Sequence, residues 1–214
     1  MNIDVKKRQR LEEIVNSTTH GIGLMAAIVY AVILIVRAEI LGNTWHIVTF
    51  SMFGLGMILL YLFSTLFHSA KNLRIKSQLN KADHSFIYVL IATTCTPFML
   101  FGVQGYFGWI LFGLVWVMAL AGIIYKVWFY KKRFRLLSTL LYILMGSTIL
   151  VAIVPLIKNI MEPDSLWFLL FGGISFLVGT IFYQGVNIRF SHGYFHLLTL
   201  TGSICHFYAI YYLL

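Results

Sequence analysis

Apolar residues along the chain fall into seven long runs, and each run is separated from the next by a short polar or glycine-containing break. A helix needs about 20 mostly apolar residues to cross roughly 30 Å of hydrocarbon. Every run meets this length, so the pattern predicts seven membrane-spanning helices. Their predicted ranges are 18–37, 45–67, 84–104, 106–125, 136–156, 165–186 and 193–213.

The breaks between the runs carry the residue types that end helices. They read LGNT at 41–44, KNLRIKSQLNK at 71–81, GVQG at 102–105, KKRFR at 131–135 and MEPD at 161–164. No break resembles a domain linker, and the chain has no internal repeat and no low-complexity segment. We therefore expect an all-α fold, a seven-helix bundle that forms one integral membrane domain over residues 1–214. Pro97 and Pro155 are expected to kink their helices.

The composition is typical of a protein whose solvent is lipid. Hydrophobic residues make up 60% of the chain and charged residues 11%, which is more apolar surface than one soluble core can bury. The first run continues without a small-residue cleavage site, so it is expected to stay as a span rather than to be removed as a signal peptide. Cys95 and Cys205 both lie inside apolar runs, where a disulfide framework is not expected.

The basic residues predict the orientation of the chain in the membrane. A net charge of +9 would suggest nucleic-acid binding in a soluble protein, but here the charges lie between apolar runs. Of the 16 Lys and Arg residues, only Arg37 and Lys158 fall on the side opposite to the N-terminus. The positive-inside rule then predicts a cytoplasmic N-terminus and an external C-terminus. The expected location is the plasma membrane.

Four ionisable side chains from three predicted helices share the cytoplasmic level. His68 ends the second span, Asp83 opens the third, and His192 and His196 open the seventh. Polar groups are costly in hydrocarbon, so such residues usually face the bundle interior and meet partners there. The partner that this set predicts is a metal ion.

The spacing of the histidines suits one ion. His192 and His196 lie on one helix face about 6 Å apart along the axis, so both rings can reach a Zn²⁺ ion at roughly 2.0–2.1 Å. His68 would supply the third ligand. Three histidines and one open position are typical of catalytic zinc sites, whereas structural sites are closed by four protein ligands. Imidazole also suits copper, iron and nickel, and Zn²⁺ is the expected cofactor.

Two further residues are candidates for catalysis. Ser64 lies one turn before His68 on the same face, so its hydroxyl could orient a water molecule or donate to a developing oxyanion. Asp83 is the natural base for that water, since it is the acidic residue expected to be buried at this level. His84 is expected to point about 100° away from Asp83 around the helix.

Two histidines are expected to play other parts. His20 lies near the same membrane level and is expected to pack against the site or to line its cavity. His206 follows His196 by ten residues, about 15 Å along a helix, which is too far to share one ion. A buried, hydrogen-bonded histidine is the expected role of His206.

Each of these residues also has a structural reading. A single His-x-x-x-His pair often caps a helix or binds water. His68 alone could be a helix end that reaches the interface, and Asp83 alone could cap the third span or interact with its dipole. Their convergence at one depth favours the metal site.

The candidate residues belong to short motifs in a fixed order. These are S-x-x-x-H at Ser64–His68, K-x-D at Lys81–Asp83, S-H-x-x-x-H at Ser191–His196 and G-S-x-x-H-F at Gly202–Phe207. Together with EEIVNSTTHGIG at 12–23, they resemble the hemolysin III branch of the progestin and adipoQ receptor superfamily, to which the adiponectin receptors and alkaline ceramidases are related. The resemblance covers nearly the whole chain. Phe195 departs from the branch, in which a tryptophan is common at this position.

The resemblance implies a seven-helix barrel with an intramembrane zinc ion bound by His68, His192 and His196, which Asp83 reaches through water. It also implies ceramidase-like chemistry, so the leading hypothesis is a zinc-dependent hydrolase of a lipid amide or ester bond. One alternative is a non-enzymatic membrane sensor or regulator with a structural zinc ion. Another is a cytolytic protein, as the family name suggests, although the sequence has no exposed amphipathic segment suited to pore formation. Membrane lipids are the expected partners, and nucleic acid is not.

Overall fold

The computed structural model describes residues 3–129, 135–160, 162–185 and 188–214, and every regular element in these ranges is helical. Nine α-helices and two π-helical segments are described in them. Their bounds are α1 Ile3–Leu41, α2 Thr44–Ser69, α3 Leu73–Pro97, η1 Phe98–Val103, α4 Gly105–Ile124, η2 Tyr125–Phe129, α5 Arg135–Gly146, α6 Thr148–Val151, α7 Ile153–Asn159, α8 Pro163–Tyr183 and α9 Ser191–Tyr211.

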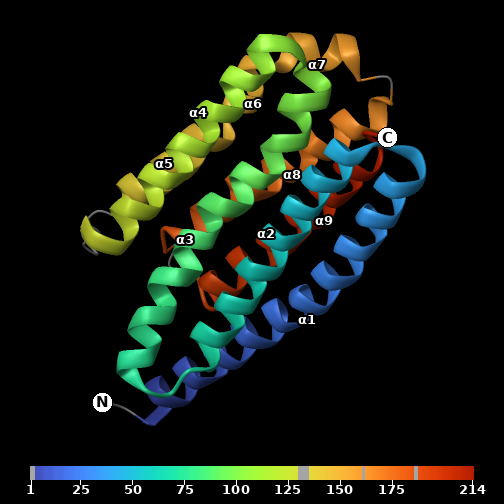
Figure 1. The fold of residues 1–214 in the computed structure, drawn as a ribbon. Coiled ribbons are helices and arrows are strands. Elements are labelled where there is room, and N and C mark those ends of the chain that lie inside the picture. The colour runs from blue at the N-terminus through green and yellow to red at the C-terminus, as the bar shows by residue number, and fades with distance from the viewer. Residues whose placement is uncertain (1–2, 130–134, 161, 186–187) are drawn as a thin grey trace.

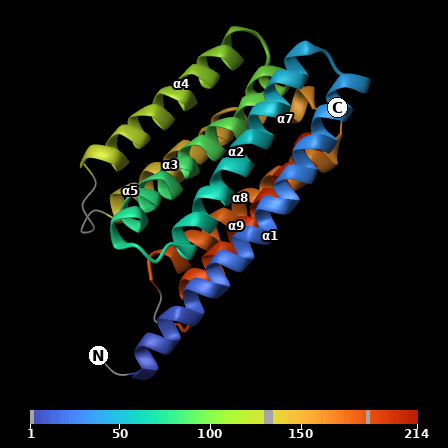
Figure 2. The same ribbon diagram turned by 60° about the horizontal axis from the view of Figure 1, so that its bottom comes forward.

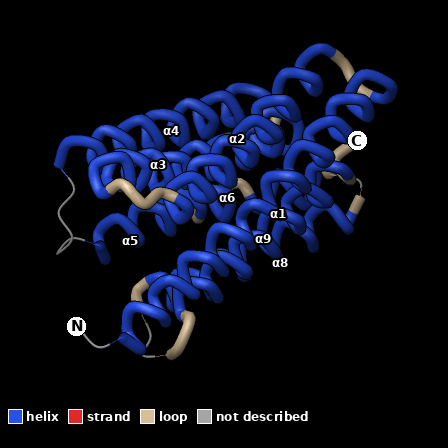
Figure 3. Tube along the Cα trace, turned by 90° about the horizontal axis from the view of Figure 1, so that it is seen from below, coloured by secondary structure: helices blue, strands red, loops and turns tan. Residues whose placement is uncertain are grey.

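The long helices run side by side along one axis, with the two termini at opposite ends of the bundle (Figure 1). Helix α1 packs against α2 and α9, and α9 packs in turn against α8. Helix α3 lies on the other side of α2 and leads to α4 and α5 (Figure 2). The view from below shows α4, α3 and α5 as one side of the bundle and α1, α9 and α8 as the other (Figure 3).

Several of the described helices can cross a membrane. By length and composition, five segments qualify: Lys7–Leu41, Thr44–Ser69, Leu73–Val103, Gly105–Phe129 and Pro163–Tyr183. The pair Arg135–Val151 and Ile153–Asn159, bent by 48°, adds a sixth if it is one span. Helix α9, with 21 residues, covers most of the last predicted range but is not among these segments. The prediction of an all-α, multi-pass membrane protein is confirmed.

Two helices begin well before the predicted spans. Helix α1 starts at Ile3, and α3 starts at Leu73 inside the predicted break 71–81. The Asn72 side chain caps α3 by accepting hydrogen bonds from the backbone N–H groups of Arg74 and Ile75. The apolar run marks where a helix enters hydrocarbon, whereas the cap marks where the helix begins. Of the predicted break 131–135, only Arg135 lies within the described residues, and it begins α5.

The two prolines act differently. Pro155 lies one turn after Val151, at the 48° bend between α6 and α7. Proline has no N–H and its ring clashes with the carbonyl four residues earlier. The bend therefore falls where the Val151 carbonyl has no N–H of residue 155 to accept from. Pro97 ends α3, and the expected kink there takes the form of the π-helical turn η1, with Leu73–Val103 continuing as one span.

Glycines on α2 hold this helix close to both of its neighbours. A Cβ atom on Gly54 would lie 2.6 Å from the Cβ of Ala31 on α1, and one on Gly56 would lie 2.4 Å from the Oγ1 of Thr93 on α3. Small residues allow such close approach of membrane helices. This packing fixes α2, and therefore His68 in its last turn, relative to α1 and α3.

Candidate metal centre

The ends of two helices carry the three predicted metal ligands. His68 lies in the last turn of α2, while His192 and His196 lie in the first two turns of α9. The chain turns into α9 through Phe190, whose φ of 60° is in the left-handed region. The Ser191 hydroxyl donates to the Phe182 carbonyl at 2.8 Å, which ties the start of α9 to the end of α8.

The structure brings the three imidazoles together. The ring centroids are 5.3 Å apart for His68 and His192, 4.8 Å for His68 and His196, and 4.6 Å for His192 and His196. One ring nitrogen of each residue lies within 4.8 Å of those of the other two. His68 is 6% exposed and His196 1%. The spacing that the sequence suggested for one shared ion is therefore present.

The donor atoms fit a zinc ion chemically. The Nε2 atom of His68 and both ring nitrogens of His196 are buried without a hydrogen-bond partner among the described residues. Leaving such atoms unpaired in an apolar interior is unfavourable, and coordination would satisfy them. Nitrogens at 2.0–2.1 Å from a tetrahedral ion lie roughly 3.3 Å from one another, a distance that small side-chain rotations would reach from the observed arrangement.

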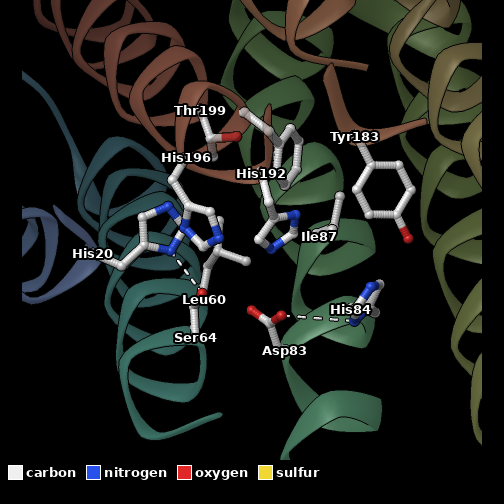
Figure 4. A pocket seen from close by; sticks show the side chains of 11 residues that line it. His20, Leu60, Ser64, Asp83, His84, Ile87, Tyr183, His192, His196 and Thr199 are labelled. Carbon is white, nitrogen blue, oxygen red and sulfur yellow. Dashed lines mark hydrogen bonds and ion pairs between the residues drawn. The ribbon is translucent and has the colours of Figure 1, made fainter. Parts of the chain in front are cut away.

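Asp83 and Ser64 lie beside the histidines. Both line one small cavity with His192 and His196 (Figure 4). Ser64 is fully buried, and its Oγ lies 2.7 Å from the Nδ1 atom of His20. Ser64 also interacts with the Asp83 carboxylate. Two candidate metal ligands, the candidate base and the candidate hydroxyl donor therefore line one cavity, and the third ligand, His68, contacts the rings of the other two.

Two other histidines line this cavity. His20 packs against His196 with ring centroids 3.7 Å apart and the ring planes tilted by 57°, and it is 2% exposed, as its expected lining role requires. His84 differs from the expectation that it points away from Asp83. Its Nδ1–H donates to the Asn80 carbonyl at 2.8 Å, yet its ring lies 3.6 Å from Asp83 Oδ2 and lines the cavity. A 100° separation around a helix still allows two long side chains to reach the same space.

Sequence reasoning missed Glu13. Its Oε2 atom lies 2.7 Å from His68 Nδ1, and its Oε1 atom accepts from Lys76 Nζ at 2.7 Å. Asp83 is therefore not the only carboxylate at this level. Glu13 precedes His20 by seven residues, which is two helical turns, so both residues lie on one face of α1. This spacing was the signal that could have identified it.

Two further polar residues, Lys126 and His206, lie inside the bundle but do not line the cavity. Lys126 directly follows the fourth predicted span, where the sequence suggests an exposed loop charge, but it is only 2% exposed, in η2, and its charge interacts with Asp83. His206 lies outside the cavity and packs against Phe176, with ring centroids 5.3 Å apart. Its position away from His68, His192 and His196 agrees with the expected separation of about 15 Å between His196 and His206 along α9.

Known proteins resemble the chain over most of its length. The model of the family described as "Haemolysin-III related" matches residues 8–207. The "Hemolysin-3 homolog" of Bacillus subtilis (strain 168) is 46% identical over 93% of this chain and 92% of its own length. The "Hemolysin-3" of Bacillus cereus is 43% identical over 93% of this chain and 90% of its own. The human "Monocyte to macrophage differentiation factor" is 28% identical over 93% of this chain and 83% of its own. The chain therefore belongs to the haemolysin III family.

Proposed function

We propose that this protein is a zinc-dependent hydrolase that cleaves an amide or ester bond of a membrane lipid. One observation carries the proposal. Three imidazoles from α2 and α9 converge on one point, and two of them, His192 and His196, line a small cavity together with a carboxylate and a hydroxyl. This combination of open metal site, base and hydrogen-bond donor is typical of metal-assisted hydrolysis.

Each residue then has a defined part. A zinc ion held by His68, His192 and His196 would supply a Lewis acid and lower the pKa of a water molecule in its open position to about 7. Asp83 accepts the proton of the attacking water. Ser64 donates to the substrate oxygen as negative charge develops on it. When His20 donates from Nδ1 to Ser64 Oγ, the single hydrogen of Ser64 is left for an acceptor in the cavity, which is the Asp83 carboxylate before substrate binds and the substrate oxygen afterwards.

We also propose seven spans in one domain, with the N-terminus in the cytoplasm and the C-terminus outside the plasma membrane. Described helices account for most of each of the seven predicted ranges, and the termini lie at opposite ends of the bundle, as an odd number of crossings requires (Figure 1). The candidate site then lies near the inner leaflet, since His68 ends α2 and His192 begins α9 at the end nearer the N-terminus. A lipid can reach such a site between helices without leaving the bilayer.

Specific observations favour two other functions. The name of the Bacillus cereus relative, "Hemolysin-3", points to lysis of cells. The nearly complete burial of His68 and His196 suits a structural ion that ties α2 to α9 in a membrane sensor or regulator. Both alternatives predict no lipid turnover by the purified protein.

Metal analysis of the purified protein tests the site first. Wild type should carry about one zinc ion per chain, and His68→Ala, His192→Ala and His196→Ala should each lose it. His46→Ala is the matched control because His46 lies at the other end of α2, where its ring stacks on Phe101. A metal content that none of the three ligand substitutions changes would refute the proposal.

Turnover of a panel of ceramides and glycerolipids then tests the reaction. Wild type should hydrolyse one class, and Asp83→Asn should not. Bound metal without turnover, together with lower thermal stability after chelation, would instead support the structural role. Release of dye from liposomes that His68→Ala leaves unchanged would support lysis.

A further inference from the structure

A carboxylate outside the cavity joins one candidate ligand to two other helices. Glu13 on α1 contacts His68 Nδ1 on α2 through Oε2, and Lys76 Nζ on α3 through Oε1, each at 2.7 Å. The side chains of His68, Lys76 and Glu13 are 4%, 24% and 39% exposed, so the link runs from the buried ring towards the end of the bundle. Glu13 is not among the residues that line the cavity.

The contact decides which nitrogen of His68 is available to a metal. A neutral imidazole carries one proton, and the nitrogen without it is the ligand. Because Glu13 accepts a hydrogen bond from Nδ1–H, the lone pair is left on Nε2. That atom is buried without a hydrogen-bond partner among the described residues.

We propose that Glu13 is a positioning residue of the metal centre: it fixes the tautomer and the ring orientation of His68 so that Nε2 faces the ion. Carboxylates that accept a hydrogen bond from a metal-binding histidine orient the ring and raise its basicity. This inference rests on the metal site of the proposed function.

Lys76 completes the arrangement. A carboxylate has two oxygens, and the ammonium group holds the one that does not face His68. The orientation of Glu13 is thereby set from α3, while its backbone belongs to α1. Two helices that carry none of the three candidate ligands thus position the ligand on α2.

His68 differs in this respect from a second candidate ligand. Neither ring nitrogen of His196 has a hydrogen-bond partner among the residues that the structure describes. The ring of His68 is therefore oriented before an ion binds, whereas His196 is held by packing against His20. Loss of the Glu13 contact should weaken metal binding through His68.

Zinc affinity, measured on purified full-length protein by competition with a chelating dye, tests this role. Glu13→Ala should raise the zinc Kd about 10–100-fold. Glu13→Gln should raise it less, because the amide oxygen can still accept from Nδ1–H while the charge is lost. Glu12→Ala is the matched control, since Glu12 pairs with Arg8 at 3.1 Å on the exposed side of α1. This control should bind zinc as wild type does.

Melting of the metal-free proteins separates positioning from folding. Glu13→Ala removes the partner of the buried His68 Nδ1, so chelated Glu13→Ala should melt below chelated Glu12→Ala, whereas chelated Glu13→Gln, which keeps an acceptor, should melt close to it. If Glu13→Ala does not yield folded protein, Glu13→Leu, which fills the space without offering an acceptor, carries the test, and wild-type affinity in that variant overturns the proposal. A zinc Kd of Glu13→Ala equal to that of Glu12→Ala also overturns it.

The zinc-binding results distinguish failure of the positioning role of Glu13 from failure of the proposed metal centre. Zinc binding that requires both His68 and Glu13 supports the positioning role even if no lipid is hydrolysed. Zinc binding that requires His68 but not Glu13 refutes the positioning role and leaves the metal centre intact. Zinc binding that is indifferent to His68→Ala refutes both.

Discussion

The contact between α8 and α9 depends on a glycine that has a matched neighbour. A Cβ atom on Gly172 would lie 2.2 Å from His206 Cδ2 and 3.0 Å from the Gly202 carbonyl oxygen. A Cβ atom on Gly173 would have no atom within 4 Å. Gly172→Ala and Gly173→Ala therefore add the same methyl group to the same helix in opposite surroundings.

The expected free-energy changes have opposite signs. The methyl group of Gly172→Ala can be accommodated only if His206 and the backbone of α9 move, because the carbonyl of Gly202 belongs to that helix. Overpacking of this kind lowers the free energy of unfolding by about 1–3 kcal/mol. Gly173→Ala gains the helix propensity of alanine over glycine, up to about 1 kcal/mol.

Thermal unfolding in detergent measures both variants. For a chain of this size, about 1 kcal/mol corresponds to a shift in Tm of about 2–4 °C. Gly172→Ala should therefore melt about 2–12 °C below wild type. Gly173→Ala should melt at the wild-type temperature or slightly above it.

Both variants should keep their zinc, since residue 206 lies about 15 Å along α9 from His196. Equal Tm values for the two variants would show that α8 and α9 do not pack as closely as the structure has them, and would refute the reasoning.

Three further predictions concern the site. Ser64→Ala should keep zinc but lower the free energy of unfolding by about 1–3 kcal/mol, because His20 Nδ1 loses its partner. Calorimetry checks this. Thr65→Val is the control, since the Thr65 hydroxyl donates to the Tyr61 carbonyl within α2. Free zinc at about 100 times its Kd should add about 2.7 kcal/mol of stability, which a melting curve with and without chelator detects, and His196→Ala should abolish the difference. Asp83→Asn should keep zinc by metal analysis and lower the rate of lipid hydrolysis by at least about 100-fold in a turnover assay.

The sequence predicts the all-helical, multi-pass architecture because hydrophobic length is a local property that lipid imposes directly. The seventh predicted helix is present as α9, whose 21 residues include His192, His196 and His206, and these polar residues lower its hydropathy relative to the five candidate spans. The apolar run also does not show where α3 begins. The helix starts at Leu73, after the cap Asn72, in a polar segment outside the hydrocarbon where hydropathy does not mark helix ends.

The grouping of His68 with His192 and His196 is predictable because all three residues end or begin helices at one level, and depth along a membrane helix follows from counting residues. What counting cannot supply is the rotation of each helix about its own axis. That rotation decides that His84 reaches the cavity and that Lys126 is buried. Packing against neighbouring helices sets it, and no local pattern encodes it.

Glu13 shows why a polar residue at a helix end can matter more than its local sequence suggests. In EEIVNSTTHGIG, Glu12 and Glu13 look equivalent, but they lie about 100° apart around α1. Glu12 faces Arg8 on the exposed surface, whereas Glu13 shares the face of His20 and so meets His68. The position of a residue on the face that already carries one cavity histidine is therefore a better guide to its role than its charge or its distance from the apolar run.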